Sequence, residues 1–406
     1  MNRHSNHLRR FNSTVTNNNS PIKLNETISK EKINILGLTG EEISNQFEVL
    51  GLLNQFPKYT INQLQNGLYI NGYTDFNQFT SLKLSHRQLL NECFIIDYGI
   101  PKSSLISTDG TRKWLLNFGG RNDIESVYIP QVNQLAANNA GHIGSLCVSS
   151  QVGCSLACKF CHTGTQKFQK NLNSSEIVAQ ILFGMRQVGD LPKPIHQRRA
   201  LTNVVFMGQG EPLYNFKNVS KAIKFINTQY NWSPWRTTIS TSGLVPLMGK
   251  IGSELSASLA VSLHAVTNEL RDSIVPINKQ YPIEELMKGC QNYLEAIQSK
   301  PSQQRRITFE YVMLEGVNDS LLEAKELVRL MRHYKIPAHF NLIPFNTWPG
   351  TIYKSTCLSQ IKKFQNVIKQ SEFPCHIRVS RGLDIMAACG QLKSLNDSKT
   401  SFTAHQ

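Results

Sequence analysis

The sequence has no long hydrophobic run, and no apolar stretch approaches the ~18–20 residues that a membrane-spanning helix needs. Acidic residues are scarce, since 28 Asp and Glu stand against 43 Lys and Arg, and no acid precedes Glu26. A secretory signal peptide is also missing. These features argue against a membrane protein and a secreted one, so we expect an intracellular protein with no membrane partner.

The chain has 406 residues, of which 40% are hydrophobic and 17% charged. This length can bury a large core, and we expect two domains plus tails. The net charge of +15 favours a polyanionic partner, of which nucleic acid is the commonest. A basic surface with a basic leader explains the charge equally well. The nine cysteines are too few for a disulfide scaffold in a chain of this length.

Three cysteines lie close together in one stretch, at Cys154, Cys158 and Cys161. Thiolates hold iron–sulfur clusters, and a [4Fe–4S] cube needs four ligands to be closed completely. Three cysteines in one loop would therefore leave one iron open. A zinc or structural role is the alternative, although His162 directly follows Cys161, which strains a Cys₃His site. The loop alone leaves both interpretations open.

The cysteine spacing is that of the radical S-adenosylmethionine (SAM) superfamily. The flanking segments Leu146–Gln151 and Ala387–Leu392 are more specific, and with them the chain resembles the RlmN family of adenine-C2 RNA methyltransferases, sister to the Cfr enzymes. The resemblance runs from about Lys32 to Leu392. It implies an α/β fold, a partial (β/α)₆ radical SAM barrel with a small N-terminal helical accessory domain. It also implies that Cys154, Cys158 and Cys161 hold a [4Fe–4S] cluster.

The first 31 residues contain Arg3, Arg9 and Arg10 together with many Asn, Ser and Thr. Such an Arg-rich, acid-poor leader is typical of a mitochondrial transit peptide. A disordered Asn-rich tail without an address is the alternative. The leader favours the mitochondrial matrix, whereas the family default is the cytoplasm.

Residues 32–96 have helical periodicity, and Thr39 is a suitable N-cap for the first helix. By resemblance this is the accessory domain associated with RNA recognition, although a plain helical cap on the catalytic domain would give the same pattern. The basic, proline-containing loop 191–199 is a second candidate RNA contact or a solvated surface loop.

Residues 97–144 form a predicted β-hairpin linker, with Asp109-Gly110 as a turn signal. The expected strands are Lys113–Leu116 and Glu125–Pro130. Glu125 lies in the family's Glu-x-Val-Tyr-Ile-Pro motif, where this carboxylate is the proposed proton acceptor. Without the family, an exposed strand glutamate would be the expectation.

Residues 145–392 alternate between strand and helix, which indicates parallel strands joined by helical crossovers. The expected strands are 145–149, 203–207, 237–239, 258–263, 307–314, 339–343 and 376–379. The expected helices are 174–188, 219–230, 283–298, 320–334 and 358–370. We take 145–392 as the radical SAM core and 393–406 as a flexible tail.

Polar and glycine-rich residues follow several predicted strands directly, as in Gly208-Gln209-Gly210-Glu211-Pro212. Reactive groups of parallel barrels gather at the carboxyl ends of strands, so we expect one site at this rim. By resemblance, the SAM-binding positions are Gly210, Glu211, Ser240, Ser262, Leu263, His264 and Asn346. Glu211 would accept hydrogen bonds from the SAM amine.

The family's mechanism assigns the two remaining motif cysteines. Cys389 takes a methyl group from a first SAM, and a 5′-deoxyadenosyl radical from a second SAM abstracts hydrogen from that S-methyl group. The methylene adds to adenine C2, Glu125 removes the C2 proton, and Cys147 releases the product by a transient disulfide with Cys389. Without the family, Cys147 and Cys389 would be buried core cysteines.

The resemblance therefore implies a methyltransferase that makes 2-methyladenosine in large-subunit rRNA and, as a second substrate, tRNA. A flavodoxin- or ferredoxin-type protein would donate the electron, and we expect a monomer. Cfr-type methylation at C8 uses the same cysteines and is the nearest alternative. A non-catalytic RNA-binding protein with a metal-stapled loop is the alternative from another class.

Overall fold

The computed structural model describes residues 32–131, 143–193, 199–299 and 305–394. The predicted leader and residues 194–198 of the predicted basic loop lie outside these ranges. A ten-stranded sheet forms the centre, in the order β14-β13-β12-β11-β10-β9-β6-β5-β4-β3. None of the helices in the described ranges is long and apolar enough to cross a membrane.

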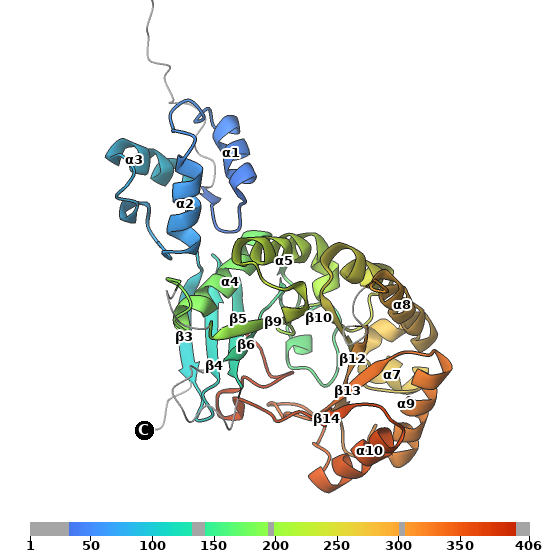
Figure 1. Cartoon of the computed structure of the whole chain (residues 1–406). Coiled ribbons are helices and arrows are strands. Elements are labelled where there is room, and N and C mark those ends of the chain that lie inside the picture. Colours follow the sequence, from blue (N-terminus) through green and yellow to red (C-terminus); the bar gives the residue numbers. More distant parts are fainter. Residues whose placement is uncertain (1–31, 132–142, 194–198, 300–304, 395–406) are drawn as a thin grey trace, which may run out of the picture.

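The first seven strands in this order run parallel to one another. They are β6 (Gly144–Cys147), β9 (Leu201–Phe206), β10 (Thr237–Thr241), β11 (Ser258–Ser262), β12 (Ile307–Met313), β13 (Ala338–Pro344) and the short β14 (Cys375–Ile377). They curve into an open barrel with the helices on the outer surface (Figure 1). The predicted partial (β/α)₆ barrel is confirmed, with β14 added at its edge.

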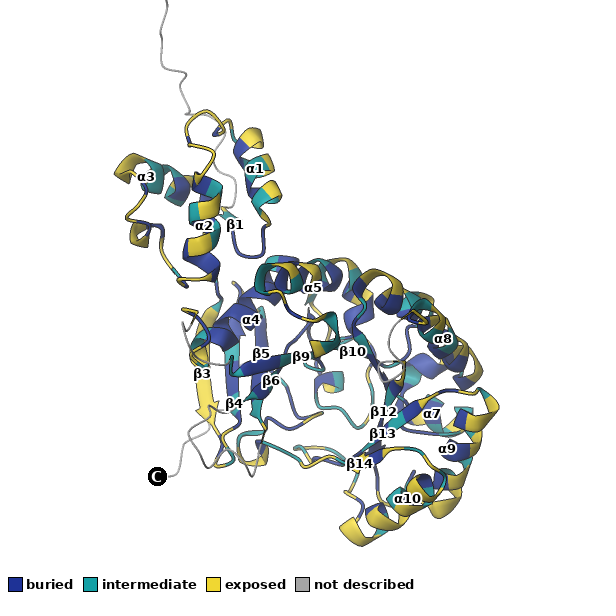
Figure 2. Ribbon diagram, viewed as in Figure 1, coloured by how far each residue is buried: buried dark blue, intermediate teal, exposed yellow. Residues whose placement is uncertain are grey.

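The crossover helices are α4 (Ser174–Gln187), α5 (Phe216–Tyr230), α6 (Met248–Lys250), α7 (Asn268–Ile274), α8 (Ile283–Ala296), α9 (Leu321–His333) and α10 (Leu358–Gln370). Capping boxes fix the start of α4, through Asn173 and Glu176, and of α9, through Ser320 and Glu323. Most of these helices bury one face against the sheet and expose the other, whereas α4 is buried on nearly every side, as Figure 2 shows. This local chemistry explains why the helical pattern could be predicted.

Three antiparallel strands extend the sheet: β5 (Asp123–Pro130), β4 (Arg112–Asn117) and the fully exposed edge strand β3 (Ile100–Ile106). The predicted hairpin is β4 and β5. It is not a separate linker, because β5 pairs with β6 and places Val127 opposite Cys147. The hairpin is therefore a wall of the barrel beside the strand that carries Cys147.

The N-terminal unit contains β1 (Ile33–Asn34), α1 (Gly40–Val49), α2 (Thr60–Tyr69), α3 (Leu84–Cys93) and β2 (Phe94–Ile95). Thr39 caps α1 as predicted. The unit rests on the outer helices of the barrel (Figure 1). There Tyr230 Oη donates to the Tyr69 carbonyl oxygen at 3.1 Å, and Lys221 Nζ lies 2.6 Å from Glu42 Oε1.

Candidate active site

The three clustered cysteines lie in the loop between β7 (Gln151–Val152) and the short 3₁₀ helix Thr163–Thr165. All three line one cavity at the carboxyl ends of the parallel strands. The loop folds tightly, because a side chain added at Gly164 would come within 2.6 Å of the Cys158 carbonyl oxygen. The structure therefore brings the predicted metal ligands to the rim where the sequence places them.

His162 uses one of its two ring nitrogens in a hydrogen bond to the backbone. Its Nδ1 lies 3.2 Å from the Gln391 carbonyl oxygen, which can only accept, so this nitrogen carries a proton. Its ring stacks on Trp348 with 4.8 Å between centroids. In the part of the chain that the structure describes, no three His, Cys, Asp or Glu side chains converge as ligands of a single ion would. This geometry disfavours the mononuclear zinc alternative.

A buried cation lies beside the cysteine loop. Arg271 is fully buried, and its guanidinium donates to the carbonyl oxygens of Ser242, Ser262 and Leu263 and to Asn278 Oδ1 at 2.7 to 3.1 Å. No carboxylate of the described residues lies within ion-pair distance of this guanidinium. A buried charge without a counter-ion is costly.

The donor set at this cavity fits an anionic iron–sulfur cluster. Burial raises the pKa of Cys154 to about 12 and raises the pKa of Cys158 and Cys161, so the free thiols are neutral. Coordination to iron holds such thiols as thiolates. The positive charge of Arg271 acts on Cys158 and would balance that negative charge.

Six of the seven predicted SAM-binding residues line the same cavity: Gly210, Glu211, Ser240, Ser262, His264 and Asn346. Leu263 does not, because its side chain is buried away from the cavity and its carbonyl oxygen accepts from Arg271 Nε. Leu263 therefore contributes its backbone, and not its side chain, to the rim.

Glu211 is a buried carboxylate on this rim. Its two oxygens accept the N–H groups of Leu213 at 3.1 Å and Ser242 at 2.9 Å, which leaves further lone pairs free. Burial raises the pKa of Glu211 to about 7. A protonated amine of a bound ligand would favour the ionised form.

His264, which lines the same cavity, is held neutral. Its Nδ1 accepts the Val312 N–H at 3.0 Å, which places the proton on Nε2. Burial lowers the pKa of this histidine to about 3. Its ring meets Phe160 of the cysteine loop edge-on, with 4.5 Å between centroids.

Replacing Gly210 by alanine should lower SAM affinity about tenfold or more, because strained backbone costs ~1–3 kcal/mol. Gly210 has φ +94°, and an added Cβ would lie 2.5 Å from Gln151 Cβ. Calorimetric titration of the reconstituted protein with SAM measures this. Gly119→Ala is the control, since Gly119 has φ +87° but open space around it. Equal SAM affinity of both variants and the parent would contradict the assignment.

Cys389 joins two cavities. It lines the cavity of the three cysteines and also a second, adjoining cavity that contains Cys147. Cys389 keeps exposed surface, but crowding by protein raises the pKa of its thiol to about 11, and burial raises that of Cys147 to about 12. The two motif cysteines, far apart in the sequence, thus meet in space. All nine cysteines lie within the described residues and are free, so no disulfide is present.

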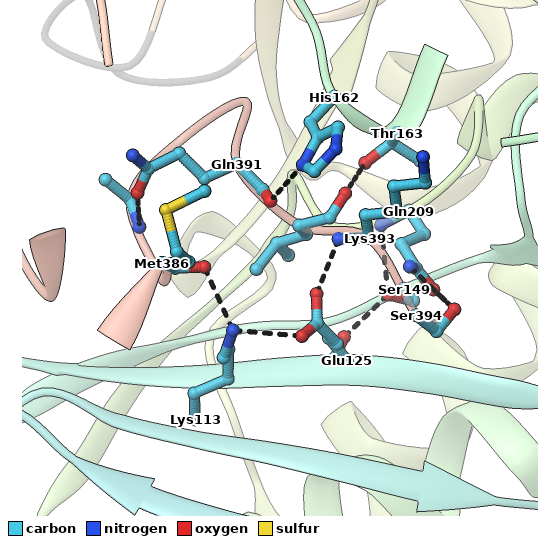
Figure 3. A network of polar contacts seen from close by, with 12 residues as sticks. Lys113, Glu125, Ser149, His162, Thr163, Gln209, Met386, Gln391, Lys393 and Ser394 are labelled. Atoms are coloured by element: carbon cyan, nitrogen blue, oxygen red, sulfur yellow. Dashed lines mark hydrogen bonds and ion pairs between the residues drawn. The ribbon is translucent and has the colours of Figure 1, made fainter. Parts of the chain in front are cut away.

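Glu125 lies next to this region but lines neither cavity. It is 5% exposed, so the alternative of an exposed strand glutamate is wrong. Its Oε1 lies 3.0 Å from Lys113 Nζ, and its Oε2 accepts the Lys393 N–H at 2.7 Å (Figure 3). Burial raises its pKa, and Lys113 opposes this effect.

The comparisons with known proteins agree with this geometry. Residues 148–328 match the model of the Radical SAM superfamily. Over 390 residues the chain is 44% identical to the dual-specificity RNA methyltransferase RlmN of Agrobacterium fabrum, covering 92% of this chain and 91% of that protein. It is 45% identical over 380 residues to the protein of the same name from Sinorhizobium fredii, covering 90% and 88%.

The chain belongs to the RlmN family. The family predicted from the cysteine motifs is thereby confirmed. A crystal structure of a radical SAM methyltransferase from Sphaerobacter thermophilus has the same fold, with a TM-score of 0.78 and 34% identity, and the match covers 88% of this chain and 98% of that one.

Gln209 connects the rim of the site to the last described residues of the chain. Gln209 stands within the Gly-x-Gly-Glu turn and is fully buried. Its Nε2 donates to Ser394 Oγ at 3.0 Å and to Gln166 Oε1 at 3.2 Å. The two described residues of the predicted flexible tail, Lys393 and Ser394, are accordingly held in place, and Ser394 is 2% exposed.

Sequence reasoning missed Lys113 and Arg271, which contact the RlmN family site residues. Lys113 could have been found from the hairpin register. Leu115 pairs with Glu125, so Lys113 is a diagonal neighbour of Glu125 on the same face. Arg271 gave no such signal, because three of its four partners are backbone carbonyl oxygens, which no side-chain pattern in the sequence marks.

Proposed function

We propose that this protein is a radical SAM RNA methyltransferase that methylates C2 of adenosine, in large-subunit rRNA and in tRNA. One observation carries the proposal: Cys389 stands between the cavity of the three cysteines and the cavity of Cys147. A sulfur in this position can receive a one-carbon unit on one side and deliver it on the other. The relatives named above as dual-specificity RNA methyltransferases support an RNA substrate.

The chemistry explains why such a relay is needed. Adenine C2 is an electron-poor carbon without a lone pair, so it does not displace a methyl group from a sulfonium directly. When bound, the cluster held by Cys154, Cys158 and Cys161 and two SAM molecules per turnover supply the methyl group and a 5′-deoxyadenosyl radical.

The chain's own residues would do the rest. Cys389 carries the carbon as a thioether and presents it to the second cavity. Glu125 accepts the proton from C2. The radical adduct returns one electron to the electron-transfer partner as it loses the C2 proton. The Cys147 thiol then gives up its proton and attacks the Cys389 sulfur, which forms a transient disulfide. The bond between that sulfur and the delivered carbon breaks with its electron pair on the carbon, which takes up a proton to become the methyl group. The apolar walls of the second cavity, among them Val205 and Leu392, exclude water from these steps.

The proposal also covers RNA recognition, the electron donor and the cellular location of the protein. The N-terminal unit, residues 32–96, would help to recognise RNA, in keeping with the net charge of +15. A flavodoxin- or ferredoxin-type protein would supply the electron to a monomeric enzyme. The Arg-rich leader favours the mitochondrial matrix.

The decisive experiment uses anaerobically reconstituted full-length protein with SAM, a reductant and transcribed rRNA and tRNA. We expect 5′-deoxyadenosine and, after nucleoside digestion and mass spectrometry, 2-methyladenosine. Formation of 8-methyladenosine instead would assign the Cfr-type reaction. Failure to form an iron–sulfur chromophore and 5′-deoxyadenosine would favour a non-catalytic RNA-binding protein.

A further inference from the structure

Residues 386–394, called the carrier segment here because they include Cys389, are held near both ends by one ion pair. Lys113 Nζ donates to the Met386 carbonyl oxygen at 3.0 Å. Glu125 Oε2 accepts the Lys393 N–H at 2.7 Å, and its Oε1 lies 3.0 Å from Lys113 Nζ. Figure 3 shows the pair between the two ends of the segment.

The other hydrogen bonds of the carrier segment come from neutral groups. The His162 N–H donates to the Gly390 carbonyl oxygen at 2.7 Å, and Asn346 Nδ2 donates to the Cys389 carbonyl oxygen at 3.0 Å. Thr163 Oγ1 donates to the Leu392 carbonyl oxygen (Figure 3). Among the described residues, Lys113 and Glu125 are thus the charged side chains bonded to this segment. Any effect of charge on the closure of the segment must therefore act through these two residues.

The closed segment also separates Glu125 from the second cavity. Leu392 lines that cavity, and the next residue, Lys393, occupies the carboxylate with its N–H. Glu125 lines neither cavity while this contact is made. Glu125 can therefore reach an adenine in the second cavity only if the segment shifts and gives up the Lys393 contact.

Both members of the pair are buried, at 8% exposure for Lys113 and 5% for Glu125. Hydrogen bonds to a charged group are stronger than those to a neutral one, particularly where water is excluded. A carboxylic acid at position 125 would therefore hold Lys113 and the Lys393 N–H less tightly than a carboxylate does.

We propose that Lys113 is a positioning residue of the reaction, because its ammonium ties the carboxylate of Glu125 to the carrier segment. The segment closes over ionised Glu125 in the free protein, gives up the Lys393 contact when the adenine binds, and stays open while Glu125 carries a proton. The proton comes from C2 of the bound adenine and turns the carboxylate into a carboxylic acid. Proton removal would thereby hold the segment open until the product has left. This inference rests on the proposed function for the origin of the proton. The contacts of Lys113 and Glu125 with the carrier segment, called the latch here, do not depend on that function.

Hydrogen–deuterium exchange of the reconstituted protein tests the latch without any turnover. In Lys113→Met and in Glu125→Gln, which mimics the protonated acid, amides of residues 386–394 should exchange about tenfold faster or more, because each variant loses a hydrogen bond to a charged group. Lys113→Arg should restore most of the protection. Lys102→Met is the matched control, since it breaks the Lys102–Asp123 pair of the same wall, which does not touch the carrier segment.

A second readout separates positioning from mere folding. Lys113→Met should load the methyl group onto Cys389 at the normal rate, seen by peptide mass spectrometry, but transfer it to RNA more slowly. If Lys113→Met is unstable, the double variant Lys113→Met/Glu125→Gln removes both buried charges and should fold with an exchanging segment. Protection like that of the parent in both Lys113→Met and Glu125→Gln, or in the double variant, would overturn the latch. A parent protein that makes no methyladenosine would overturn the proposed function and leave the exchange result intact.

Discussion

Cys389→Ala should lose RNA methylation by about 10³-fold or more, the scale seen when a covalent nucleophile is removed, while SAM cleavage continues. The three cysteines and the SAM-binding rim do not depend on this side chain, because Cys389 is only one wall residue of their cavity. The relay between the two cavities, however, has no other thiol than Cys389 that lines both.

The measurement compares 5′-deoxyadenosine and methyladenosine formed per enzyme under single-turnover and steady-state conditions. Cys357→Ala is the matched control, since Cys357 is an exposed thiol that lines neither cavity, and it should remain fully active. Normal methylation by Cys389→Ala would show that the carrier role is wrong.

Arg271→Met should destabilise the cluster-free protein by ~3 kcal/mol or more, because each buried acceptor left without a donor costs ~1–3 kcal/mol. Arg271 bonds to Ser242, Ser262, Leu263 and Asn278, so it ties the ends of β10 and β11 together at the rim. Removing an uncompensated buried charge offsets part of this loss. The net effect remains large because methionine offers no donor to replace the guanidinium.

Urea unfolding monitored by fluorescence gives the change in the free energy of unfolding. Arg329→Met is the control, since Arg329 is an exposed residue paired with Glu326 on α9, and its loss should stay within ~0.5 kcal/mol. A matching unfolding midpoint for Arg271→Met and Arg329→Met would refute the structural role of Arg271.

Much of the barrel could be predicted because its determinants are local. The capping boxes of α4 and α9 and the apolar strands are visible in short windows of sequence. The rim residues followed from the rule that the carboxyl ends of parallel strands meet at one edge. Gly210, Glu211 and His264 indeed share a cavity with the three cysteines.

Glu125 shows why the rest could not be predicted. Its burial comes from the carrier segment, and the Glu125–Lys393 hydrogen bond joins residues 268 positions apart. No local pattern encodes such a contact. For the same reason Ser394, which bonds to Gln166 and Gln209, was placed in a flexible tail.

The third antiparallel strand of the sheet was missed for a related reason. The strand β3 is exposed along its whole length, so it lacks the alternation of polar and apolar residues that predicts a half-buried strand. Its position is determined by pairing with β4, from Ile100 opposite Asn117 to Ile106 opposite Arg112. Pairing of this kind depends on register rather than on composition.

The measurement that tests the relay most directly is label transfer in a single turnover. Cys389 is first loaded with a fully deuterated methyl group, free SAM is removed, and unlabelled SAM, reductant and RNA are added. The account predicts that the first 2-methyladenosine carries two deuterium atoms and that 5′-deoxyadenosine carries one. An unlabelled first product would contradict the account, because the transferred carbon would then have bypassed Cys389.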